Sequence, residues 1–276
     1  MSEETGYFSS FDGTKLFYRT FEHAAASRAL IIVHGFGEHS GRYLELIEAV
    51  RSLPLSIFLF DLRGHGQSEG ERVYADSFRY FVDDAEKFRQ FLEARYPRIH
   101  SFILMGQSFG GLIASALVLK NSSSWVALIL LSPFFSLPKA NRFLHWFSLC
   151  LNMMIPKIVW NNPIQPAFLT HDSAELEHYQ QDSLIQRRIT TRLTSEMFKA
   201  GKSVFEKAGE VALPVLILAS GDDHIVSLEK TKGFFERISS IDKKMQIFDG
   251  FYHELLHEKD RQKPIGILRD YLSSLV

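Results

Sequence analysis

Two serines in this sequence lie in the pattern G-x-S-x-G, which can present a serine hydroxyl as a nucleophile. One is Ser108, at 106–110, and the other is Ser68, at 66–70. A serine hydroxyl is a weak nucleophile near neutral pH, so it needs a positioned base, usually a histidine that a carboxylate holds in the right tautomer. Such a group attacks the carbonyl carbon of an ester, thioester or amide. The pattern alone does not distinguish the two serines.

The residues around Ser108 predict a strand, a sharp turn and a helix. An apolar run at 102–105 leads directly into the motif, and a pattern typical of a helix follows it. Such a turn strains the backbone of the nucleophile and needs small residues two positions to either side, which Gly106 and Gly110 supply. Ser68 lies instead in a glycine-rich polar loop with no strand immediately before it. We therefore expect Ser108 to be the nucleophile and Ser68 to belong to a structured loop.

His253 is the histidine best placed to act as the base. It follows the last apolar run, at 245–248, and so lies on a loop beyond the carboxyl end of a predicted strand. Ligands approach an open parallel sheet at that edge. The expected chain order of nucleophile, acid and histidine also puts the base late in the sequence. For the acid, Asp222 and Asp223 both follow the run at 215–219, and the residues alone leave that choice open.

An oxyanion hole needs two backbone N–H groups aimed at the oxygen that becomes negative during acyl transfer. The residue after the nucleophile, Phe109, is expected to supply one of them. The other is expected from Phe36, in the glycine-flanked turn that follows the apolar run at 29–33, where His34 would brace the loop. No histidine and carboxylate pairing has metal-ligand spacing, so neither a metal nor a cofactor is expected.

The elements that must position these residues are short apolar runs separated by helical patterns. Such runs are typical of buried parallel strands. Apolar residues between 78 and 92 recur every three or four positions and predict a helix that ends near Pro97. This alternation predicts an α/β fold with a mostly parallel central sheet and helices on both faces. The runs are at 29–33, 56–60, 102–105, 126–131, 215–219 and 245–248.

The alternation stops between residues 133 and 210, where the sequence is helical and loop-like with no convincing buried strand. We interpret this segment as a helical cap inserted into one core domain, made of residues 1–132 and 211–276. An apolar stripe at 143–155 contains Trp146 and Phe147. These two residues are expected to bind substrate by lining a tunnel for an acyl chain, and the cap is also expected to rest transiently against a membrane or micelle.

Charge and cysteine content narrow the classes of partner. The formal net charge is −1, which gives no field suited to nucleic acid and favours a neutral or amphiphilic substrate. The single cysteine, Cys150, cannot form an internal disulfide, and the acidic first residues have no apolar run behind them. We expect a cytoplasmic protein without a membrane span. Any contact with membranes is expected to be peripheral.

Five stretches closely resemble the monoacylglycerol lipase and lysophospholipase family of α/β-hydrolases, and the resemblance covers nearly the whole chain in order. They are HGFGEHSGRY at 34–43, GHGQSEGER at 64–72, GQSFGG at 106–111, SGDDHIV at 220–226 and FYHELLH at 251–257. The resemblance implies the α/β-hydrolase fold and selects Asp223, because the family's acid precedes one variable and two apolar residues. It maps the oxyanion donors onto Phe36 and Phe109, and it implies that Glu38 and Arg42 form a polar patch near the substrate's head group.

The sequence departs from the family pattern at the nucleophile, where Gln107 and Phe109 replace the commoner His and Met, and at His257, one position later than in mammalian monoacylglycerol lipases. These departures leave the head-group preference open. The expected activity is hydrolysis of the ester of a single-chain lipid through an acyl-enzyme. A serine aminopeptidase or thioesterase on the same scaffold is the alternative, since fold does not fix substrate. An inactive binding protein is disfavoured because all three triad positions are filled.

Overall fold

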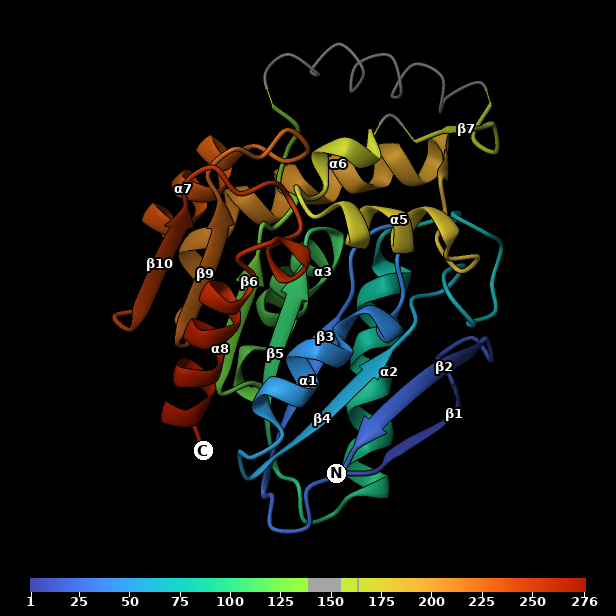
Figure 1. Cartoon of the computed structure of the whole chain (residues 1–276). Helices are drawn as coiled ribbons and strands as arrows, with labels where there is room; N and C mark the ends of the chain where they lie inside the picture. Colours follow the sequence, from blue (N-terminus) through green and yellow to red (C-terminus); the bar gives the residue numbers. More distant parts are fainter. Residues whose placement is uncertain (139–154, 163) are drawn as a thin grey trace.

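An eight-stranded sheet forms the centre of the computed structural model, which describes residues 1–138, 155–162 and 164–276 (Figure 1). The strand order is β1-β2-β4-β3-β5-β6-β9-β10. Neighbouring strands from β4 to β10 run parallel, whereas β2 pairs antiparallel with both β1 and β4. The strands are β1 (Glu3–Ser9), β2 (Lys15–Phe21), β3 (Arg28–Val33), β4 (Leu55–Phe60), β5 (Ser101–Gln107), β6 (Ala127–Leu131), β9 (Val215–Ser220) and β10 (Lys243–Phe248).

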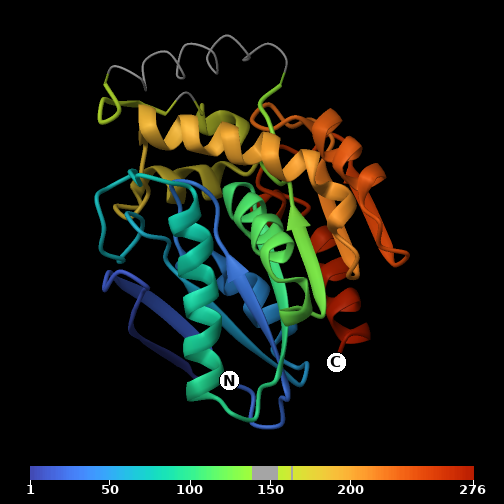
Figure 2. The ribbon, with the colours of Figure 1, turned by 180° about the vertical axis from the view of Figure 1, so that it is seen from behind.

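Helices cover both faces of the sheet. α1 and α8 lie on one face, and α2 and α3 lie on the other, as the two opposite views show (Figures 1 and 2). The described α-helices are α1 (Leu44–Val50), α2 (Arg79–Arg95), α3 (Phe109–Lys120), α5 (Ser173–Gln181), α6 (Thr191–Glu206), α7 (Leu228–Arg237) and α8 (Gln262–Ser274). The predicted mostly parallel sheet with helices on both faces is confirmed.

The core has two layers, one on each face of the sheet. Along β3, Ile31 and Val33 belong to the apolar cluster that includes residues of α2 and α3, whereas Leu30 and Ile32 belong to the cluster that includes residues of α1 and α8. Side chains alternate between the faces of a strand, so a strand buried on both faces must be apolar at every position. This explains why the runs of the five inner strands are almost entirely apolar, whereas the run of the edge strand β10 contains the exposed Gln246. All six predicted runs are strands of the sheet.

Four strands differ from the sequence-based expectation. β1 was not predicted because most of its side chains are exposed and give no apolar run, and β2 was not predicted because Lys15, Arg19 and Thr20 interrupt its apolar residues. Within the segment at 133–210, β7 (Val159–Asn161) and β8 (Arg188–Thr190) form a short antiparallel ribbon. Strands of three residues are too short to leave a pattern in the sequence.

Most of the described part of this segment lies beyond the carboxyl ends of the parallel strands, where α5 and α6 cross above the sheet (Figure 1). The apolar stripe at 143–155, with Trp146 and Phe147, lies outside the described residues except for Ile155. Within the described ranges, no helix is both long enough and apolar enough to span a bilayer.

A single residue, Ser108, separates β5 from α3. Ser108 has φ 51° and ψ −114°, a conformation that strains a residue with a Cβ atom. Its backbone makes three hydrogen bonds. The N–H donates to the Leu131 carbonyl oxygen, at 2.9 Å, and the carbonyl oxygen accepts from the N–H groups of Phe134, at 2.9 Å, and Leu112, at 3.1 Å. A Cβ atom on Gly110 would lie 2.1 Å from the carbonyl oxygen of Val33, so only glycine fits there.

We therefore expect Gly110→Ala to lower the free energy of unfolding by about 3 kcal/mol or to prevent folding, because neither backbone can move away from the added methyl group. Urea denaturation followed by circular dichroism measures this. Gly266→Ala is the matched control, since no atom lies within 4 Å of a Cβ placed on this α8 glycine. That change is expected to raise stability by roughly 0.5–1 kcal/mol. Similar small effects of both changes would contradict this account of the turn.

Candidate active site

Ser108 lies at the carboxyl edge of the sheet, between the end of β5 and the start of α3. Its side-chain hydroxyl has no hydrogen-bond partner among the described residues. Catalytic hydrogen bonds are often long before substrate binds, so the absence of a bond from Ser108 Oγ to a base does not exclude a candidate base. The hydroxyl borders a pocket and can meet an incoming carbonyl group.

Asp223 and His253 form a buried pair on two neighbouring loops. Asp223 Oδ2 lies 2.8 Å from His253 Nδ1, and the two side chains are 1% and 5% exposed. The other carboxylate oxygen accepts hydrogen bonds from the N–H groups of Ile225 and Val226, each 2.8 Å long. A carboxylate only accepts, so His253 Nδ1 carries a proton and Nε2 of the neutral ring is left as an acceptor. This is the tautomer that a base needs to take a proton from a serine.

The surroundings of His253 change its basicity. Burial by itself lowers the pKa of this imidazole, but the charge of Asp223 and the hydrogen bond to it outweigh burial, with smaller contributions from Glu254 and Glu38. The net result is a pKa above the ordinary value for histidine. The ring therefore holds a proton more tightly than an isolated histidine, which favours accepting one during the reaction.

The neighbouring Asp222 has a different environment. Its side chain is 56% exposed, and its Oδ1 lies 3.4 Å from Nε2 of His224. The structure thus brings Asp223 and not Asp222 to the ring of His253, which is the acid that the family resemblance implies.

The loop after β3 runs beside Ser108. A Cβ atom built on Gly35 would lie 3.4 Å from the Ser108 Cβ. His34 braces this loop, because its Nε2 accepts a hydrogen bond of 2.9 Å from the Leu62 N–H and its Nδ1 lies 2.7 Å from the carbonyl oxygen of Gly35. Burial lowers the pKa of His34 to about 4, so the ring stays neutral near pH 7. This histidine supports the loop and is not placed to serve as a base.

The N–H groups of Phe36 and Phe109 have no acceptor among the described residues. Phe109 is the first residue of α3, where the N–H has no partner within the helix, so both groups are free to donate to a bound oxygen atom. The Phe36 and Phe109 rings lie 6.4 Å apart between centroids. The structure therefore brings the two predicted oxyanion residues together next to Ser108.

Glu38 and Arg42 are buried in a network that connects this loop to the loop of His253. The Arg42 guanidinium binds both carboxylate oxygens of Glu254, at 2.8 and 2.7 Å. Glu38 accepts hydrogen bonds from the Gly35 N–H and from the hydroxyl of Tyr43, and lies 3.6 Å from Arg42. These contacts fix the loop. Direct contact of Glu38 and Arg42 with a head group stays a prediction.

Glu254 is a site residue to which the sequence analysis gave no role, although it lies within the family stretch at 251–257, directly after the predicted base. Burial by itself raises the pKa of this carboxyl, but Arg42 and His257 outweigh it and hold the pKa well below its usual range. The side chain is therefore ionised near neutral pH. A buried carboxylate needs such partners, because an unpaired charge in the interior is very costly.

Ser68 is held in a different way from Ser108. Its hydroxyl donates to the carbonyl oxygen of Asp61, at 2.5 Å, and accepts from the N–H of Phe17, at 2.8 Å. The residue is 1% exposed. Its hydroxyl is fully used in joining the 61–70 loop to β2, which agrees with the predicted structured loop.

A narrow apolar pocket of about 70 Å³ opens at Ser108. That is the space of about two water molecules, so longer groups require the lining side chains to move. Only three of the described lining residues are polar, namely Ser108, Asn162 and Thr194. The apolar lining residues are Phe36, Phe134, Leu137, Trp160, Ile164, Ile189, Met197, Phe198 and Ile225.

Comparisons of the sequence with known proteins identify relatives among hydrolases. The human monoglyceride lipase is 32% identical over 252 residues, which cover 90% of this chain and 82% of that protein. Phospholipase YtpA of Bacillus subtilis is 29% identical over 250 residues, covering 90% of this chain and 95% of that protein. The uncharacterized protein YnbC of Escherichia coli is 27% identical over 98% of this chain, which spans only 46% of the length of YnbC.

Comparisons of the structure agree. The monoacylglycerol lipase of Paleococcus ferrophilus has a TM-score of 0.81 and 25% identity, with 99% of each chain covered. A soluble variant of the Saccharomyces cerevisiae monoglyceride lipase, crystallised with a substrate analog, has a TM-score of 0.88 at 18% identity, covering 99% of this chain and 96% of that one. The second likeness shows the fold alone.

The resemblance read from the sequence is thereby confirmed. The family model Hydrolase_4, described as serine aminopeptidase, S33, matches residues 24–260. Because this match covers most of the chain and the fold agrees with it, the chain belongs to the serine aminopeptidase S33 family of α/β-hydrolases, alongside the monoglyceride lipases.

Proposed function

We propose that this protein hydrolyses the carboxylic ester of a single-chain lipid, a lysophospholipid or a monoacylglycerol, through Ser108, His253 and Asp223. The observation that carries the proposal is the apolar pocket that opens directly at Ser108. An ester carbonyl can reach the hydroxyl there while its acyl chain contacts hydrocarbon side chains, and each buried methylene contributes about 0.8 kcal/mol.

The chain is a carboxylic ester hydrolase, in keeping with the lipase and phospholipase names of its relatives. In the proposed reaction His253 Nε2 takes the proton of Ser108 as Oγ attacks the carbonyl carbon. The N–H groups of Phe36 and Phe109 stabilise the oxyanion. The protonated imidazole then gives its proton to the leaving alcohol, and an acyl-enzyme remains. Water, deprotonated by His253, attacks that ester and releases the acid while Ser108 regains its proton.

In this proposal residues 133–210 form a helical cap over a core made of 1–132 and 211–276. Most of the described pocket lining belongs to the proposed cap, including Trp160 and Met197. A cap over the nucleophile excludes water and admits substrate by moving. Trp146 and Phe147 would extend the acyl site, and transient contact of the cap with a membrane or micelle also stays part of the proposal, as does a cytoplasmic location.

The nucleophile assignment predicts opposite outcomes for two alanine substitutions. Ser108→Ala is expected to abolish covalent labelling by a fluorophosphonate and to lower kcat by roughly 10⁴-fold or more, because the attacking group is gone. Ser68→Ala is expected to keep the labelling, with a loss of about 1–3 kcal/mol in stability from its two buried hydrogen bonds. Labelling that survives in the Ser108 variant and disappears in the Ser68 variant would reverse the assignment.

The acid assignment predicts a change in both rate and pH profile. Protonated His253 cannot act as a base, and its pKa is raised, so activity should fall on acidification from a pH above the ordinary value for histidine. Asp223→Asn removes the charge that raises this pKa. It should lower kcat/KM by roughly 10⁴-fold and move the remaining acidic limb to lower pH. Asp222→Asn, at the exposed neighbour, should change neither quantity. Equal damage from both variants would contradict the assignment.

The lipid proposal predicts that kcat/KM rises along a series of p-nitrophenyl esters from acetyl to octanoyl, because the growing chain buries hydrocarbon. Ile164→Ser, in the pocket, should flatten the rise while sparing the acetyl ester. Ile267→Ser, a partly buried isoleucine on the opposite layer of the core, is the matched control and should leave the slope unchanged. A flat profile in the unmodified protein would remove the lipid proposal, and turnover of aminoacyl amides or acyl-CoA instead would favour the aminopeptidase or thioesterase alternative.

A further inference from the structure

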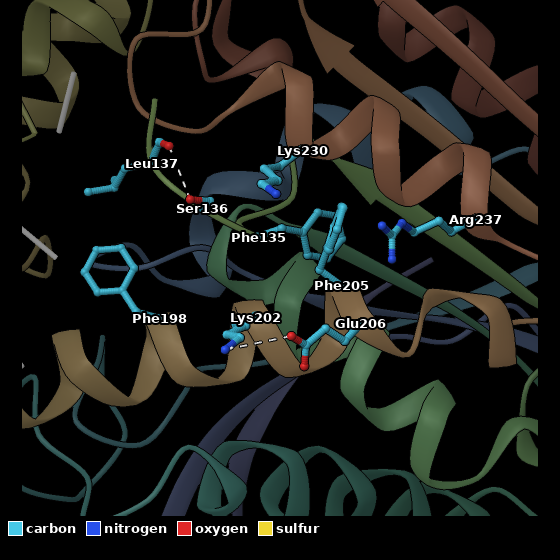
Figure 3. Close-up of a pocket in the computed structure, with 9 residues that line it drawn as sticks. All are labelled: Phe135, Ser136, Leu137, Phe198, Lys202, Phe205, Glu206, Lys230 and Arg237. Atoms are coloured by element: carbon cyan, nitrogen blue, oxygen red, sulfur yellow. Dashed lines mark hydrogen bonds and ion pairs between the residues drawn. The ribbon is translucent and has the colours of Figure 1, made fainter. Parts of the chain in front are cut away.

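A second cavity, of about 510 Å³, lies between α6 and α7 (Figure 3). We call it the α6–α7 groove. Along α6, the lining side chains recur at the spacing of one helical face, and those of α7 lie opposite them. The lining residues are Phe135, Ser136, Leu137, Phe198, Lys202, Phe205, Glu206, Lys230 and Arg237.

Cations outnumber carboxylates in this groove. Lys202, Lys230 and Arg237 face a single acidic residue, Glu206. The pair between Lys202 and Glu206 is long, at 3.9 Å, and both side chains are well exposed, so it neutralises little. The groove therefore carries an excess of positive charge.

Two of these cations have no acidic partner in the described part of the chain. Lys230 Nζ lies 4.4 Å from the ring centroid of Phe205, and the Arg237 guanidinium carbon lies 4.6 Å from the same centroid. Figure 3 shows the Phe205 ring between α6 and α7, with these two side chains to either side of it. The face of an aromatic ring stabilises a cation but does not neutralise its charge, so an anion can still bind.

The rest of the lining is hydrocarbon. Phe135 is buried and stacks on Phe234, with ring centroids 4.2 Å apart, which gives the groove a rigid aromatic wall. Leu137 and Phe198 continue the apolar surface. Cations beside such a surface match a molecule with an anionic end and a hydrocarbon chain.

The groove adjoins the ester pocket. Leu137 and Phe198 line both cavities, so the groove begins where the described lining of the ester pocket ends. That pocket has no cation in its described lining. A carboxylate formed there would be poorly solvated, which is unfavourable. The groove on the other side of Leu137 and Phe198 offers cations in its lining.

We propose that the α6–α7 groove binds a fatty-acid anion and receives the acid product of the reaction. The product role rests on the proposed function. Hydrolysis adds the hydroxyl of water to the acyl carbon and breaks its bond to Ser108 Oγ. The resulting acid loses its proton near neutral pH. Lys230 and Arg237 hold the carboxylate, and the chain lies along Phe135, Leu137 and Phe198.

The test is a calorimetric titration of sodium laurate, below its micellar concentration, into the Ser108→Ala protein. This variant lacks the proposed nucleophile, so the titration measures binding alone. Lys230→Gln/Arg237→Gln in that background should weaken laurate binding at least tenfold. The control, Lys232→Gln/Lys244→Gln, removes the same charge from exposed positions outside the groove and should change the affinity less than twofold. Equal affinity in the two double variants would overturn the proposal.

Two further arms define the ligand and the role. Dodecyl phosphate that binds at least tenfold more tightly than laurate would identify a phosphate site and overturn the fatty-acid assignment. In the active enzyme, the groove double variant should raise the inhibition constant of laurate by the same factor as its dissociation constant. The control double variant, Lys232→Gln/Lys244→Gln, should leave that inhibition constant unchanged. Laurate binding that depends on the groove, together with no turnover of lauroyl esters, would refute the proposed function and the product role while leaving the ligand class intact.

Discussion

The arrangement of the site depends on one close approach between backbones, where the first turn of α3 packs against the end of β3. Gly110 permits it, because a Cβ atom there would lie 2.1 Å and 2.4 Å from the carbonyl oxygens of Val33 and His34. The same contact brings the loop with Phe36 beside Ser108. Ser108 and the loop of Phe36 are therefore positioned by one packing constraint. The strained backbone of Ser108 is tolerated because hydrogen bonds to Leu131, Phe134 and Leu112 hold it in place.

A buried ion pair extends this constraint to the loop of His253. Arg42 lies at the end of the loop that carries Phe36, and Glu254 directly follows His253, so their paired hydrogen bonds join the two loops. Burying both charges is costly, and such a pair adds little net stability compared with apolar residues of the same shape. Separating it is far more costly, because one charge would remain unpaired in the interior. Its effect is thus to keep the two loops in a single relative arrangement.

The fold was largely predictable, whereas the coupling between distant loops was not. The five inner strands give almost entirely apolar runs because both of their faces are buried, whereas the run of the edge strand β10 contains the exposed Gln246. Ser108 and His253 lie after two of the predicted strands, as expected, and their catalytic roles stay a proposal. Asp223 could not be separated from Asp222 by residue type, since a single hydrogen bond to His253 makes the difference. The ion pair of Glu254 and the α6–α7 groove both depend on contacts between segments far apart in the sequence, and a local sequence pattern does not predict such contacts.

The charges around the pocket also bear on which substrates suit it. An aminopeptidase needs an acidic group to hold the ammonium group of its substrate, and the described lining of the ester pocket has none. The carboxylates nearest in the described site already have partners: Asp223 binds His253, Glu254 binds Arg42, and Glu38 accepts from Gly35 and Tyr43. If one of these carboxylates bound the ammonium group, its present partner would be left as an unpaired buried cation or donor. That loss would cost several kcal/mol of free energy. An uncharged ester with a hydrocarbon chain places no such demand, so this electrostatic arrangement favours lipid esters over peptides.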